Sequence, residues 1–144
     1  MELLKAYLDY AVFGILGLMG FIALWVTLQR IFYYRSVKWQ DFQHAEHLNI
    51  ALTKHLTTLS IVGANAPYVG LLGTVLGILI TFYDLGKGQN LDTGAIMLGL
   101  ALALKATAAG IAIAIPSIMA YNGLVRKVDV INAQFRATKT DANQ

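Results

Sequence analysis

Three long stretches of the chain are almost free of charged side chains. Residues 10–29 and 55–83 contain no Asp, Glu, Lys or Arg, and residues 93–125 contain only Lys105. Each stretch is at least as long as the roughly 20 apolar residues that a helix needs to cross a bilayer. The pattern predicts an all-α membrane protein, a single membrane domain over residues 1–144. Its three transmembrane helices are expected at 10–32, 60–83 and 94–123.

The polar segments between these spans are short. In the segment 36–59, hydrophobic residues recur at spacings of three and four, which predicts an amphipathic helix continuous with the second span. These residues are Phe42, Ala45, Leu48, Leu52, Leu56 and Leu59. A polar turn at 84–93, which includes Asn90, separates the second and third spans. The tail 124–144 keeps a helical period, so we expect the third helix to extend from the membrane into water.

The distribution of basic residues predicts the orientation in the membrane. The segment 30–54 contains four Lys and Arg residues and the segment 126–139 contains four more, whereas the N-terminus and the turn contain only Lys5 and Lys87. Cytoplasmic loops carry an excess of Lys and Arg. We therefore expect the N-terminus and the turn outside, and the segments 36–59 and 124–144 in the cytoplasm.

The composition excludes several classes of site. The chain is 57% hydrophobic and 13% charged, whereas soluble domains are about 25% charged. It has no cysteine, which excludes disulfides and thiolate metal sites. His44, His47 and His55 are interpreted as solvated side chains rather than metal ligands. No catalytic motif is present, so we expect no enzyme activity, cofactor, metal or nucleic-acid partner.

Small residues follow one face of the second and third spans. Gly70, Gly73 and Gly77 are three and four positions apart, with Thr74 beside them. A matching stripe in the third span contains Ala103, Thr107, Gly110, Ala114 and Ser117. Small residues let helix backbones approach closely within a bilayer, so these faces are expected to pack against other helices. Pro116 is expected to kink the third helix.

Thr74 and Thr107 are expected at similar depth, roughly 15–20 Å inside the membrane, because each lies ten or more residues from the outer end of its helix. One interpretation is that each hydroxyl bonds the carbonyl four residues earlier and simply packs an interface. The other is that the two line a hydrated path or a groove for a partner. Both interpretations stay open from the residues alone.

The charges impose a further condition. All eight acidic residues lie outside the predicted spans, and a threonine hydroxyl does not titrate. If the protein moves protons, the titrating carboxylate must therefore come from another chain. Lys105 is the one charge inside a span, and a lysine there should face protein or water. It pairs between subunits, binds a lipid head group or a partner's acid, or extends to the membrane surface.

Two motifs resemble the proton-channel region of the ExbB/TolQ/MotA energisers. They are ANAPYVGLLGTVLGILITF at 64–82 and LALALKATAAGIAIAIPSIMAYN at 100–122. The resemblance extends from about residue 55 to 127, and the short length favours the ExbB group. It implies a pentameric homo-oligomer in the bacterial inner membrane around an apolar pore. It also implies that an ExbD-like single-pass partner places its helix and an aspartate in the pore.

The resemblance further implies that proton flow past this aspartate energises a TonB-like protein and thereby outer-membrane import. The pore threonines of the family match Thr74 and Thr107, and its helix-three proline matches Pro116. Relatives often carry a glutamate where this chain has Leu102, and a leucine where it has Lys105. The alternatives are a TolQ-like energiser of envelope maintenance, or a structural scaffold for partner helices.

Overall fold

The computed structural model describes residues 2–88 and 92–142, and all regular structure in them is helical. The elements, in chain order, are α1 (Glu2–Ser36), the short 3-10 helix η1 (Trp39–Asp41), α2 (Ala45–Thr53), α3 (Leu56–Gly86) and α4 (Thr93–Ala142). Of these, α1, α3 and α4 are long and apolar enough to cross a membrane. The predicted set of three spanning helices is therefore confirmed by length and composition.

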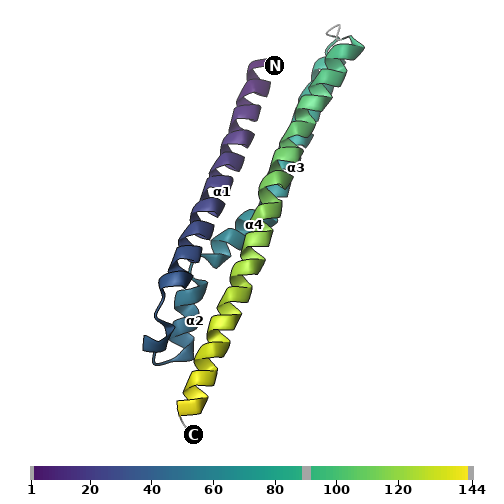
Figure 1. Ribbon diagram of the computed structural model, residues 1–144. Helices are drawn as coiled ribbons and strands as arrows, with labels where there is room; N and C mark the ends of the chain where they lie inside the picture. Colours follow the sequence, from purple (N-terminus) through teal and green to yellow (C-terminus); the bar gives the residue numbers. More distant parts are fainter. Residues whose placement is uncertain (1, 89–91, 143–144) are drawn as a thin grey trace.

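The long helices form one elongated unit (Figure 1). α3 and α4 run antiparallel and in contact, and α1 packs beside both of them. The N-terminus and the α3–α4 connection lie at one end, and η1, α2 and the C-terminus lie at the other. Both basic segments, 30–54 and 126–139, are therefore near the same end of the molecule. Asn90 of the predicted turn lies outside the described residues.

The third helix extends well beyond the predicted span. α4 continues without interruption from Thr93 to Ala142, so the polar tail belongs to the same helix. Pro116 lies within it, and α3 likewise contains Pro67. The predicted kink at Pro116 stays a prediction.

Two clusters of buried side chains hold the unit together. The larger cluster joins α2 and the start of α3 to the C-terminal half of α4, and it includes the periodic residues of the polar segments. Leu48, Leu52 and Leu59 are fully buried there, packed with Val128, Ile131 and Phe135 of α4 and with part of α1. The smaller cluster is built from Val12, Leu16, Ala66, Ala106 and Ala114.

The amphipathic segment is not continuous with α3, and this part of the prediction was wrong. α2 ends at Thr53, and His55 has a positive φ of 69° immediately before α3 begins. Histidine is among the non-glycine residues that enter the left-handed region most readily. The chain therefore turns between α2 and α3, although the spacing of the leucines continues across the turn.

Side chains from α1 bind the end of α2. Arg30 donates from Nη1 to the carbonyl oxygens of Ala51 at 2.9 Å and Leu52 at 3.4 Å, and the Tyr34 hydroxyl also donates to Leu52 O. The last carbonyls of a helix lack partners within it and carry partial negative charge. Arg30, only 2% exposed, supplies both donors and a compensating positive charge at the point where the helix stops.

Candidate functional site

The backbones of α3 and α4 are in direct contact at the small-residue faces. A Cβ atom at Gly70 would lie 2.5 Å from the carbonyl oxygen of Ala106, and one at Gly110 would lie 2.5 Å from that of Ala66. Real Cβ atoms essentially never come this close to another atom. The two glycines therefore permit an approach that any other residue would prevent.

The next two glycines of α3 extend the same contact. At Gly73 a Cβ would lie 2.8 Å from the Val12 side chain of α1 and 3.0 Å from that of Ala106. At Gly77 it would lie 3.1 Å from the Cβ of Ala103. Three helices meet at Gly73, so the small face of α3 is covered by α1 as well as by α4.

Thr74 and Thr107 form a hydrogen bond across this interface. Their hydroxyl oxygens are in direct contact, and Thr74 is 6% exposed while Thr107 is half-buried. The Thr74 hydroxyl also lies 2.8 Å from Ala103 O, across the interface, and 3.3 Å from Gly70 O in its own helix. The two threonines are thus coupled to each other instead of each bonding only its own helix.

The direction of the bond follows from proton counting. A hydroxyl has one proton to donate, and a carbonyl oxygen can only accept. The proton of Thr74 is therefore used on Ala103 O, its closer carbonyl partner, and the proton between the two threonines comes from Thr107. The result is a chain of donors that runs from Thr107 through Thr74 to the backbone of α4. Thr107 retains lone pairs that can accept a further hydrogen bond.

The packing of α1 changes the predicted depth of one acid. Val12 meets Gly73, near the middle of the second span, and Lys5 Nζ would lie 3.2 Å from a Cβ at Gly99 of α4. Asp9 lies between these contacts, about one helical turn from the level of Gly73. The prediction that every acid lies outside the depth of the spans was therefore wrong for Asp9, because sequence alone does not fix how α1 is positioned along α3. The Asp9 side chain is exposed, whereas the threonine pair is enclosed between α3 and α4.

Lys105 lies on the outer surface of the unit. Its side chain is exposed, and Nζ is 6.0 Å from the centre of the Phe13 ring of α1. Lys105 is therefore near α1 and takes no part in the hydrogen bonds of the threonine pair.

Two polar features were not predicted from the sequence. Thr81 is buried on α3 two turns after Thr74 and donates to Gly77 O at 3.0 Å. Its spacing of seven from Thr74 is a signal that could have revealed it. The binding of Arg30 and Tyr34 to the end of α2 left no such signal, because the contact joins residues about 20 positions apart.

The comparisons agree with this architecture. The family model described as the MotA/TolQ/ExbB proton channel family matches residues 41–137, a range that contains both threonines. A biopolymer transport protein ExbB of Helicobacter pylori is 51% identical over 140 residues, covering 97% of each chain. The ExbB of Aquifex aeolicus is 52% identical over 128 residues, covering 89% of this chain and 86% of its own.

A third relative is a putative ExbB-like protein of Helicobacter pylori, 44% identical over 128 residues, which cover 89% of this chain and 85% of the relative. The family model thus covers well over half of the chain, and these alignments include nearly all of it. They confirm the resemblance inferred from the two motifs. The chain belongs to the MotA/TolQ/ExbB proton channel family.

Proposed function

We propose that this chain is the ring-forming subunit of an ExbB-like energiser in the bacterial inner membrane. With an ExbD-like companion it would use proton-motive force to power TonB-dependent import through the outer membrane. The observation that carries the proposal is the buried hydroxyl pair of Thr74 and Thr107, which has no carboxylate among its hydrogen-bond partners in the described residues. A companion helix must then bring the acid.

The direction of the hydrogen bonds supports a specific role for the pair. Because Thr107 donates to Thr74, it is left as an acceptor toward a companion's side chain. A protonated carboxylic acid can donate to it at once, whereas a carboxylate can be bound only if Thr107 turns its proton away from Thr74. The pair would therefore favour the neutral form of the acid and release it on deprotonation.

The proposed topology places the N-terminus outside and the C-terminus in the cytoplasm. It rests on the two basic segments, which Figure 1 shows near the same end of the molecule, and on the rule that Lys and Arg accumulate on the cytoplasmic side. In this arrangement η1, α2 and the C-terminal half of α4 form a cytoplasmic extension. Several chains, in our proposal five, would surround the companion helices, with the α3–α4 face toward the pore.

The energetic demand on such a device is modest for each proton. One elementary charge crossing the membrane releases about 2.3 kcal/mol per 100 mV. A large conformational step in a TonB-like protein would therefore need several protons, and a ring of identical chains offers several equivalent hydroxyl pairs.

Deletion of the chain tests the biological assignment. A strain without it is expected to grow poorly on limiting iron while it keeps its resistance to detergents, because TonB-dependent import would lack its energy source. Growth in graded chelator and survival in detergent are the measurements, with the restored chain as control. Normal growth on limiting iron combined with detergent sensitivity would instead identify a TolQ-like role in the envelope.

A further inference from the structure

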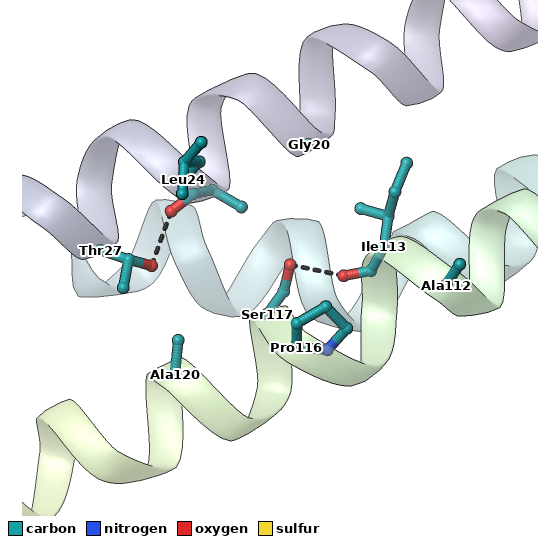
Figure 2. A pocket seen from close by; sticks show the side chains of 9 residues that line it. Gly20, Leu24, Thr27, Ala112, Ile113, Pro116, Ser117 and Ala120 are labelled. Atoms are coloured by element: carbon teal, nitrogen blue, oxygen red, sulfur yellow. Dashed lines mark hydrogen bonds between the residues drawn. The ribbon is translucent and has the colours of Figure 1, made fainter.

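A continuous groove runs between the second half of α1 and α4. Its two parts have volumes of about 280 and 420 Å³, and Thr27 and Ala120 belong to the walls of both. Figure 2 shows the first part, with α1 on one side and α4 on the other. Small residues such as Gly20, Ala112 and Gly123 keep the groove open.

The hydroxyls in the walls are turned toward their own helices. Thr27 donates to Ala23 O and Ser117 donates to Ile113 O, each at 2.7 Å, as the dashed lines in Figure 2 indicate. With its only proton used, neither hydroxyl offers a donor to the groove. The walls are therefore suited to hydrocarbon rather than to a file of water molecules.

The far end of the groove is basic. Arg35 and Lys127 both line it and are exposed, together with the ring of Tyr34, and no acidic residue belongs to the lining. Arg35 follows Gly20 by 15 positions along α1, a distance of about 22 Å. One leaflet of a bilayer has a hydrocarbon depth of about 15 Å. The groove thus spans one leaflet, and its cations lie at the level of the head groups.

We propose that this groove binds an anionic phospholipid of that leaflet. An acyl chain lies between α1 and α4, along Gly20, Thr27 and Ala120, and the phosphate is held by Arg35 and Lys127. Arginine and lysine beside a membrane attract anionic lipids, and the apolar groove fixes where the bound lipid sits. The lipid would be a structural part of the unit, because it fills the gap between α1 and α4.

A second copy of the chain is a poorer occupant. Neighbouring subunits of a ring have the same orientation, so a second copy would bring its own basic residues to the level of Arg35 and Lys127. Like charges at this distance repel, and an anion between them removes the repulsion. The charge of the groove therefore selects a lipid head group over another subunit.

Spin-labelled lipids test the site in vesicles that contain the full chain. Phosphatidylglycerol labelled near the end of its acyl chain is expected to be immobilised about tenfold more strongly than labelled phosphatidylcholine, the order of effect that two cations produce. The double variant Arg35→Gln/Lys127→Gln should reduce this preference to less than twofold. Gly123→Leu should displace about one immobilised lipid of either kind per chain. Its side chain would occupy the groove, where a Cβ at Gly123 meets no atom within 4 Å.

The matched control is Arg126→Gln/Arg136→Gln. It removes the same net charge from exposed positions on α4 that do not line the groove. An equal loss of preference in the control would show general electrostatic attraction and overturn the proposal. So would displacement of the labelled lipid by inorganic phosphate alone. A Gly123→Leu variant that keeps all its immobilised lipid but loses its oligomeric mass would show that a second copy fills the groove, and would also overturn the proposal.

Discussion

Thr107→Val is expected to abolish TonB-dependent uptake while the chain still inserts into the membrane. Valine keeps the shape of threonine but removes the hydroxyl that lies between Thr74 and the proposed acid of the companion. Hydrogen bonds to charged groups contribute about 1.5–3 kcal/mol, so the loss in transport rate should be roughly 10- to 100-fold. Thr107→Ser, which retains a hydroxyl, should recover most of the activity. Uptake of an iron complex and the amount of chain in the membrane are the two measurements.

Thr74→Val should also abolish uptake, because it removes the acceptor for Thr107 and the bond to Ala103 O. Thr81→Val is the matched control. It is the same substitution on the same helix, at a hydroxyl that bonds Gly77 O in its own helix and takes no part in the pair. Its uptake should stay near that of the unmodified chain. Full uptake by both Thr74→Val and Thr107→Val would count decisively against a role in the proton path.

The second large effect is expected at the contact of the two backbones. In Gly110→Ala and Gly70→Ala, the new methyl group would meet a carbonyl oxygen of the opposite helix at 2.5 Å. Since backbone atoms cannot move aside as a flexible side chain does, α3 and α4 must separate. Overpacking of this kind costs about 1–3 kcal/mol or more. Thermal unfolding of the purified protein in detergent, followed by its helical signal, should show a lower midpoint for both variants.

Gly17→Ala provides the control for this experiment. Gly17 is in α1, and a Cβ there would meet no atom within 4 Å. Alanine has a higher helix propensity than glycine, so this variant should be at least as stable as the unmodified chain. Equal midpoints for Gly17→Ala and Gly110→Ala would contradict the close contact of α3 and α4.

The distribution of charges was sufficient to predict the number and type of long helices. Gaps without charge of this length have only one solution in a bilayer, since every backbone group must be bonded within its segment. The small faces were also visible, because glycine and alanine at spacings of three and four are uncommon unless another backbone approaches. These features depend on local sequence, and local sequence was available.

Other features depend on contacts between distant residues. The turn at His55 is stabilised by Arg30 and Tyr34, whereas the leucine spacing alone favours an unbroken helix. The depth of Asp9 depends on where Val12 meets Gly73. The donor direction within the threonine pair depends on Ala103 O. None of these follows from periodicity, because each depends on how one helix is positioned along another.

Proton flux into liposomes measures most directly whether the acid is supplied by a companion. Under an imposed potential, liposomes that contain only this chain are expected to show no flux above empty ones, and addition of the ExbD-like companion should open the path. The companion with its aspartate replaced by asparagine should close the path again. Asp9→Asn should leave the flux of the complex unchanged, because Asp9 is exposed and the threonine pair is enclosed. Conduction by the chain alone, above all if Asp9→Asn abolished it, would contradict the proposal.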